Sequence, residues 1–236
     1  MALRQESHCL PIPLDLCDIM IDLHTHTIFS DGELIPSELV RRAVVHGYTA
    51  IGLTDHVDFT NIEFVLKSVK QAKYLEKEWD VHVIAGVELT HVPPNKMEKL
   101  VTKARQLGAE LIVVHGETVA EPVVPGTNSA TVRLDGVDIL AHPGLISIED
   151  AETASDNGIH LEITSRKGHI MTNGHVSKIA NEADATLIFT TDAHCPEDLI
   201  TREKAIEVAM GAGLDKSDAD RVVSDNSRKL LERILG

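Results

Sequence analysis

Residues 137–164 read VDILAHPGLISIEDAETASDNGIHLEIT and contain the unit that is repeated along the chain. Val137–Leu140 is a short apolar run that predicts a strand, and Ile148–Asn157 predicts a helix that Gly158 ends. Ile159–Thr164 then predicts a second strand. Two strands that are joined through a helix pair in parallel, so the stretch indicates an α/β fold.

The same alternation of strand and helix runs through the whole sequence. The predicted strands are 18–23, 48–53, 81–87, 110–114, 137–140, 159–164 and 186–191, and the predicted helices are 36–46, 62–79, 94–107, 148–157, 174–183 and two more from Pro196 and Ser224 onward. Seven such units in 236 residues favour a closed TIM-like barrel, with an open doubly wound sheet as the alternative. We predict a single domain over residues 1–236, with an N-terminal tail at 1–17 and a C-terminal helical segment at 214–236.

Composition and charge argue against several classes of protein. Hydrophobic residues make up 43% of the chain and charged residues 25%, which is ordinary for one soluble domain. No run approaches the roughly 20 apolar residues of a membrane helix and no signal peptide is visible, so we expect a cytoplasmic protein. The net charge of −15 argues against charge-driven binding to nucleic acid or to a membrane. Cys9, Cys17 and Cys195 form no CxxC pair, which argues against a disulfide framework or a thiolate zinc site.

Metal-competent side chains stand at the carboxyl end of every predicted strand. In chain order they are His24 and His26, Asp55 and His56, Glu88, His115, His142, Glu162, and Asp192 and His194. In a barrel these ends converge on the face where barrel enzymes keep their active sites. One such residue alone is more often a hydrogen-bonded core group. Because buried polar groups are costly, their recurrence at every strand end favours a functional site.

Two of these pairs have the spacing that suits a shared ligand. In His24-Thr25-His26 and Asp192-Ala193-His194, the outer residues are two apart, so in an extended segment both side chains point to the same side. Imidazole and carboxylate ligands without thiolate suit Zn, Mn or Fe. The donors are too many for one ion.

Six motifs follow one another along about residues 19–194. They are Asp22-Leu23-His24-Thr25-His26-Thr27 with Ser30-Asp31-Gly32, Thr54-Asp55-His56, Gly86-Val87-Glu88, His115-Gly116, Ala141-His142-Pro143-Gly144 and Thr191-Asp192-Ala193-His194. Their order and content resemble the polymerase and histidinol phosphatase (PHP) superfamily of metal-dependent phosphoesterases. The resemblance implies a distorted (β/α)7 barrel that holds three divalent metal ions.

The resemblance also implies a role for each ligand. The first ion would be held by His24, His26 and Asp192, the second by His115 and His142 with Glu88 as a bridge to the first, and the third by Asp31, His56 and His194. A hydroxide that bridges the first two ions would attack phosphorus. Asp192 or His194 would pass a proton to the leaving oxygen.

Other residues near these strand ends are candidates for supporting roles. Arg166 and Lys167 follow a predicted strand and would grip a substrate phosphate, although a solvated charge pair is an equal alternative. Asp55 would orient a ligand imidazole from behind. The loop 116–129 would be a substrate lid or a static wall.

The remaining histidines and Cys195 are expected to lie outside the site. We expect His169 and His175 to be exposed loop residues, although substrate contacts are the alternative, and His91 to face away from the cup. Cys195 is interpreted as a bystander. No site is assigned to the last group, His8, His46, His82 and His160.

The predicted function is hydrolysis of a phosphate ester, either a small phosphomonoester such as histidinol phosphate or a nucleotide. Aromatic residues are only 3% of the chain, which favours small substrates over long strands that need stacking platforms. One alternative is an amidohydrolase-type metal hydrolase, which would leave Asp31, His56 and Glu88 without a required function. Another is a barrel subunit of a nucleic-acid-processing assembly. The complete ligand set and the negative net charge argue against it.

Overall fold

Eight β-strands and the helices between them make up residues 20–236, the part of the chain that the computed structural model describes. The predicted tail 1–17, with His8, Cys9 and Cys17, lies outside the described residues. The strands are β1 (Met20–Thr25), β2 (Tyr48–Leu53), β3 (His56–Val57), β4 (His82–Leu89), β5 (Leu111–His115), β6 (Ile139–Ala141), β7 (His160–Thr164) and β8 (Leu187–Thr190).

Helices follow nearly every strand. The longer ones are α1 (Pro36–Val45), α2 (Ile62–Gln71), α4 (Pro94–Gln106), α6 (Ile148–Asp156), α7 (Asn173–Glu182), α8 (Arg202–Gly211) and α10 (Ser227–Leu235). Shorter turns are η1 (Ala72–Leu75), α3 (Glu76–Trp79), α5 (Thr127–Thr131), η2 (His169–Thr172), η3 (Pro196–Asp198), α9 (Lys216–Asp220) and the π-helical η4 (Arg221–Asn226). None of the helices within residues 20–236 is long and apolar enough to cross a membrane.

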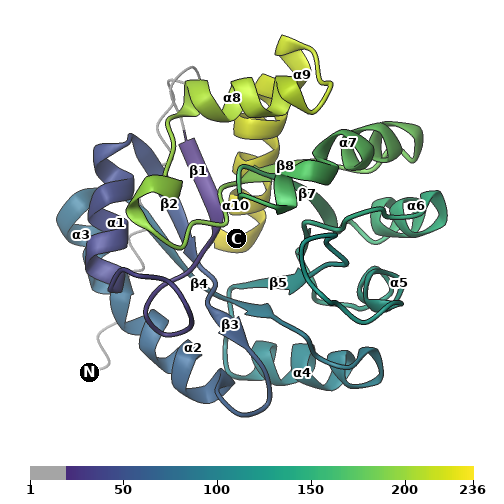
Figure 1. Ribbon diagram of the computed structural model, residues 1–236. Helices are drawn as coiled ribbons and strands as arrows, with labels where there is room; N and C mark the ends of the chain where they lie inside the picture. Colours follow the sequence, from purple (N-terminus) through teal and green to yellow (C-terminus); the bar gives the residue numbers. More distant parts are fainter. Residues whose placement is uncertain (1–19) are drawn as a thin grey trace.

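The strands form one parallel sheet that curves into a nearly closed barrel. Its order is β1-β2-β4-β5-β6-β7-β8, with the two-residue β3 paired to β4, and the helices surround it (Figure 1). The first and last strands meet at their carboxyl ends, where the His26 amide donates to the Ala193 carbonyl at 2.8 Å. The Asp22 carboxylate also accepts the Thr191 hydroxyl at 2.5 Å. The predicted single-domain, distorted TIM-like barrel is confirmed.

Helix α6 shows why the sequence forms these units. The Ser147 side chain accepts a hydrogen bond from the Asp150 amide and caps the first turn. Ala151 and Ala154 lie one helical turn apart and are buried against the sheet. The chain leaves the helix through Gly158, whose φ of 66° suits a residue without a side chain.

One predicted helix does not form where the sequence indicated it. The predicted helix 62–79 is continuous as α2, η1 and α3, but the helix predicted from Pro196 onward is wrong. Only the single turn η3 forms there, because Leu199 returns to an extended conformation. Helix α8 instead begins after Thr201, whose side chain caps it by accepting from the Lys204 amide.

The barrel interior is apolar and is closed at its amino end. Inward side chains of the strands pack together with Leu230 and Leu231 of α10, which lies by β1 near the middle of the ring (Figure 1). The Asn226 amide group donates to the Leu187 carbonyl at the start of β8, which places this segment at the amino end. Burying each leucine stabilises the fold by about 1.5–3 kcal/mol. Because the amino end is closed, the open end of the barrel is the one formed by the carboxyl ends of the strands.

His160 at the start of β7 provides a test of stability against pH. Burial, and next the charge of Arg233, lower its pKa from 6.5 to about 4. The folded protein thus binds this proton less tightly than the unfolded chain, so the associated stability is complete above pH 6.5 and is lost as the pH falls toward 4. Between pH 7 and pH 5, the free energy of unfolding measured with urea should fall by about 2 kcal/mol more in wild type than in His160→Gln. An equal fall in the two proteins would contradict a lowered pKa of His160.

Candidate metal centre

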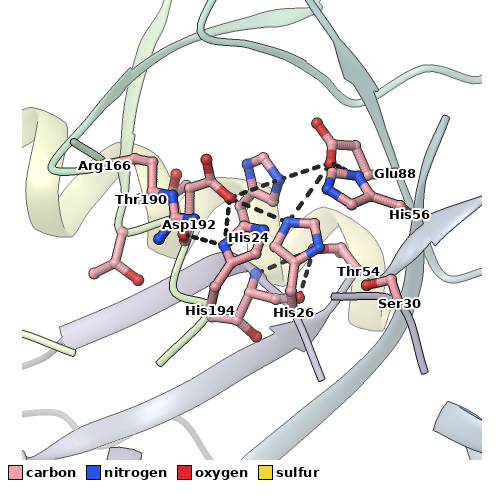
Figure 2. Close-up of polar contacts among 12 residues, drawn as sticks. His24, His26, Ser30, Thr54, His56, Glu88, Arg166, Thr190, Asp192 and His194 are labelled. Atoms are coloured by element: carbon pink, nitrogen blue, oxygen red, sulfur yellow. Dashed lines mark hydrogen bonds and ion pairs between the residues drawn. The ribbon is translucent and has the colours of Figure 1, made fainter. Parts of the chain in front are cut away.

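All nine predicted ligand residues come together at the carboxyl end of the barrel. Strand β1 and the following loop bring His24, His26 and Asp31, and β3, β4 and β5 bring His56, Glu88 and His115. The segments after β6 and β8 supply the rest, His142, Asp192 and His194. Figure 2 shows several of these side chains pointing toward one another from separate strands.

An irregularity in β1 aims its last side chains into this site. The pairing of β1 with β2 shifts register between Asp22 and Thr25. As a result Leu23 packs in the inner apolar cluster, while the next residue, His24, reaches the donors above it. Register shifts of this kind commonly redirect side chains beside functional sites.

Two of the donors stand on strained backbone. His142 has a φ of 28° and Asp192 a φ of 52°, both in the left-handed region that residues other than glycine seldom adopt. A hydrogen bond from the His142 amide to the Glu162 carboxylate, at 2.8 Å, holds His142 in this conformation. Such strain concentrates where side-chain direction serves a function.

Glu88 lies at the centre of the cluster and is fully buried. Its Oε2 is 3.4 Å from His24 Nε2 and 2.7 Å from His56 Nδ1, and its Oε1 is 3.6 Å from His142 Nε2. Burial opposes ionisation of Glu88, but the charges of His24 and His56 outweigh it and hold the pKa well below its usual range. The carboxylate can therefore face more than one ion.

A second group of donors surrounds Asp31 at the rim. Its Oδ1 lies 3.5 Å from His56 Nε2 and its Oδ2 lies 3.3 Å from His194 Nε2. Burial would raise the pKa of Asp31, but hydrogen bonds with His194 and His56 lower it below its ordinary value. His26 belongs to the same compact group.

Ring orientations allow the implied division into three ions but do not fix it, since His26 and His56, which it places on different ions, are also tilted by 40°. An imidazole lone pair lies in the ring plane, so two rings stacked face to face cannot direct their lone pairs at one ion. The pairs assigned to one ion are strongly tilted: His24 with His26 at 55°, His56 with His194 at 50°, and His115 with His142 at 71°. The stacked pair His26 and His194, tilted by only 22°, is divided between different ions.

The donors also have free atoms that a cation would satisfy. Within residues 20–236, the buried side-chain atoms without a hydrogen-bond partner include His24 Nε2, both ring nitrogens of His26, both oxygens of Glu88 and Asp192 Oδ1. An unsatisfied buried polar atom costs about 1–3 kcal/mol. The buried nitrogen and oxygen donors thus fit divalent metal ions such as Zn, Mn or Fe.

Glu162 is a positioning residue that the assignment of ligands left out. Its Oε1 accepts the Nδ1 proton of His24 at 2.7 Å and the Thr190 hydroxyl at 2.5 Å. The same carboxylate holds the His142 amide. By fixing His24 with Nδ1 protonated, Glu162 leaves Nε2 free to face the cluster.

Replacing Glu162 with glutamine is expected to weaken metal binding about 10- to 100-fold at the ion held by His24, because the ring loses the charged acceptor that orients it and raises its basicity. Titration against a chromophoric chelator measures this affinity. Glu98→Gln, on the exposed face of α4, removes the same charge far from the cluster and serves as the control. An unchanged affinity would contradict the role of Glu162.

The structure corrects the role expected for Asp55. Its carboxylate accepts from the amide and hydroxyl of Thr27 and from the hydroxyl of Ser30, at 2.8–3.0 Å, and not from a ligand imidazole. The hydrogen bonds instead hold the loop that carries Asp31. Local sequence gives the proximity of Asp55 to the site but not its partner.

Residues that the sequence placed outside the site also line the cup. His169 is buried and stacks on His142 at 4.1 Å, so its expected place in an exposed loop is wrong. Glu121, which no motif indicated, enters from the loop after β5. His91 lies at the rim with its Nε2 3.4 Å from Glu121, contrary to the expectation that it faces away.

Arg166 lines the cup and Lys167 does not. The Arg166 guanidinium pairs with Asp198 at 2.7 Å, and the same carboxylate oxygen accepts the His194 amide. Lys167 is exposed. His175 lies on α7 and donates to the Ile146 carbonyl, which gives it a structural role.

Comparisons with known proteins agree with this architecture. A protein of Methanocaldococcus jannaschii that is described as uncharacterized is 51% identical over 215 residues, which cover 90% of this chain and 99% of that protein. The DNA polymerase/3'-5' exonuclease PolX of Bacillus subtilis is 24% identical over 77% of this chain, and the match spans only 35% of PolX. Among solved structures, a chain of archaeal ribonuclease P with mature tRNA has the same fold, with a TM-score of 0.69 and 16% identity over 91% of this chain and 90% of that chain. A family model described as the PHP domain matches residues 22–187. Since this match covers more than half of the sequence, the chain belongs to the PHP domain family.

Proposed function

We propose that this protein is a metal-dependent phosphoesterase that hydrolyses a terminal phosphate ester of a small molecule or nucleotide at a trinuclear site. The observation that carries the proposal is the convergence of nine imidazole and carboxylate residues, with unpaired buried donor atoms, at the open end of the barrel. When bound, divalent ions there would supply a water of lowered pKa and take up charge on the phosphoryl oxygens.

The charge around the cup supports an anionic substrate despite the acidic chain. Three divalent ions would outweigh the three carboxylates assigned to them, Asp31, Glu88 and Asp192, and so reverse the local sign of a chain with net charge −15. Arg166, although paired with Asp198, presents its guanidinium at the cup wall. Its fork of donors suits a phosphoryl group.

We assign proton handling at the leaving oxygen to Asp192 rather than to His194. His194 donates its Nδ1 proton to the Asp192 carbonyl at 2.9 Å, which leaves Nε2 as a lone-pair donor toward the Asp31 side. Asp192 and His194 both line the cavity, so the assignment rests on the His194 proton being held by the Asp192 carbonyl. A side chain that transfers a proton to the leaving oxygen must lie within hydrogen-bond reach of the substrate.

The rim group favours phosphate esters over amides as substrates. An amidohydrolase would have no required use for Asp31 and His56, yet these residues form a compact donor group with His26 and His194. Donors placed this close together are costly unless a cation joins them. The third ion that they would hold is the feature that separates the two chemistries.

The ends of nucleic-acid strands are a second candidate substrate. The observation that favours them is the similarity to the DNA polymerase/3'-5' exonuclease PolX, together with the fold shared with a chain of ribonuclease P. A cup that receives one terminal phosphoryl group needs no long basic surface, so the net charge of −15 does not oppose a short end.

The test combines elemental analysis with hydrolysis assays of protein loaded with Mn or Zn. The substrates are p-nitrophenyl phosphate and short oligonucleotides with labelled 5' or 3' ends. About three ions per chain with metal-dependent phosphate release would support the proposal, and stepwise nucleotide release would move it to the second candidate. Fewer than two ions with no release after reconstitution would contradict both.

A further inference from the structure

The loop between β5 and α5 carries an acidic side chain into the cup. Glu121 is one of the residues that line the cavity together with the donors. Its Oε2 is 3.2 Å from His115 Nε2 and 3.4 Å from His91 Nε2, and its Oε1 is 3.6 Å from His169 Nε2. Three imidazoles from three different segments thus converge on one carboxylate.

Glu121 lies beside His115, which the resemblance implies as a ligand of the second ion. His115 has its Nδ1 beside the Gly116 carbonyl at 3.1 Å, so Nε2 is the atom that faces the cup. His142, His115 and the bridging Glu88 would give the second ion three protein donors. A catalytic ion with three protein donors keeps a position open for substrate. The Glu121 carboxylate lies next to one of these donors, 3.2 Å from His115 Nε2.

His169 is arranged to face an anion and not to share the second ion. Its ring is stacked on His142 with an interplanar angle of 18°, so the two rings cannot direct lone pairs at one ion. Its Nδ1 is held by the Thr118 hydroxyl at 2.6 Å. Its Nε2 is therefore fixed toward Glu121.

The loop can release Glu121 without unfolding its base. The Glu117 carboxylate accepts from the amides of Gly126 and Asn128, both at 2.9 Å, and ties the two ends of the loop together. Between these ends the tip is open to solvent, with the Glu121 side chain 40% exposed. Tip residues of such a tied loop can move while its ends stay fixed.

We propose that His91 and His169, beside the assigned metal ligand His115, form a subsite for a phosphoryl group and that Glu121 occupies this subsite until substrate displaces it. A carboxylate has the negative charge and oxygen atoms that a phosphoryl group would present to the same nitrogens. The remaining cavity is about 50 Å³, which has room for only a few water molecules. Displacement of Glu121 would enlarge this space for a phosphate ester. This inference rests on the proposed phosphoesterase function.

The arrangement makes the apparent affinity for phosphate depend on the loop. If the subsite is open in about one molecule in ten, binding is about tenfold weaker than at a permanently open subsite. Removing the Glu121 carboxylate should therefore strengthen phosphate binding about tenfold. The ion count should stay the same, because the nine assigned donors are untouched.

The experiment is calorimetric titration of the metal-loaded full chain with inorganic phosphate, with elemental analysis of each sample. Glu121→Gln and Glu121→Ala are expected to bind phosphate about tenfold more tightly than wild type, with unchanged ion content. Glu98→Gln, which removes a charge from the exposed face of α4, should match wild type. In wild type, saturating phosphate should also speed amide hydrogen exchange over residues 119–125.

Unchanged or weaker phosphate binding in both Glu121 variants would overturn the inference. So would the loss of one ion per chain in these variants, because Glu121 would then be a permanent ligand. If wild type hydrolyses phosphate esters while the variants bind phosphate as it does, the subsite inference alone fails. If metal-loaded wild type neither hydrolyses esters nor binds phosphate, the proposed function fails, and the inference fails with it.

Discussion

Glu88→Gln is expected to lower the rate of phosphate ester hydrolysis at least about a thousandfold and to reduce the ion content of the purified protein. Glu88 lies within 3.6 Å of ring nitrogens of His24, His26, His56 and His142, which the implied assignment divides among all three ions. An amide of the same shape keeps the packing but loses the charge that would bridge two ions. Losing about 4 kcal/mol of charge stabilisation in the transition state corresponds to a factor of about a thousand.

The measurement is kcat and ion content for the same preparations, with circular dichroism to confirm that the barrel has folded. Glu98→Gln is the matched control because it is exposed on α4 and contacts no donor of the cluster. Full ion content with wild-type kcat in Glu88→Gln would remove Glu88 from the bridging position. Loss of ions with retained kcat would mean that hydrolysis does not use the cluster.

The fold and most of the donors could be predicted from short sequence patterns, whereas Asp31 and the division of the donors among ions came only from the resemblance to the PHP superfamily. Alternation of strands and helices led to the parallel barrel, and the HxH spacing at His24 and the DxH spacing at Asp192 placed donors at strand ends. In a barrel, strand ends have to meet, so position in sequence was enough to predict proximity in space. The short strand β3 was not predicted, although its pairing sets His56 opposite Glu88.

The residues that were missed depend on contacts that no local pattern encodes. Glu121 comes from a loop whose path is set by the bonds of Glu117 to the loop's far end. His169 follows Gly168 in a segment with loop character, and its burial comes from distant partners, the His142 ring and the Thr118 hydroxyl. Asp55 was placed correctly near the site, but its hydrogen-bond partners were decided by the fold of the loop after β1.

Removal of the metal ions with a chelator is expected to lower the melting temperature of the protein by about 10–20 °C at pH 7.5. Each ion present at a hundred times its dissociation constant stabilises the folded state by about 2.7 kcal/mol, so two such ions contribute about 5 kcal/mol. For a domain of this size, each kcal/mol shifts the melting temperature by about 2–4 °C. Without ions, the buried donors of His26 and Glu88 lose their partners.

The same experiment at lower pH tests whether metal binding releases protons. Burial lowers the pKa of His56, but the charge of Glu88 outweighs it and raises the value from 6.5 to about 10. An ion must displace this proton to bind the ring, so binding releases protons and weakens as the pH falls. The melting temperatures with and without chelator should therefore approach each other from pH 7.5 to pH 5.5. Equal melting temperatures at pH 7.5, in samples that elemental analysis shows to differ in ion content, would exclude the cluster as a source of stability.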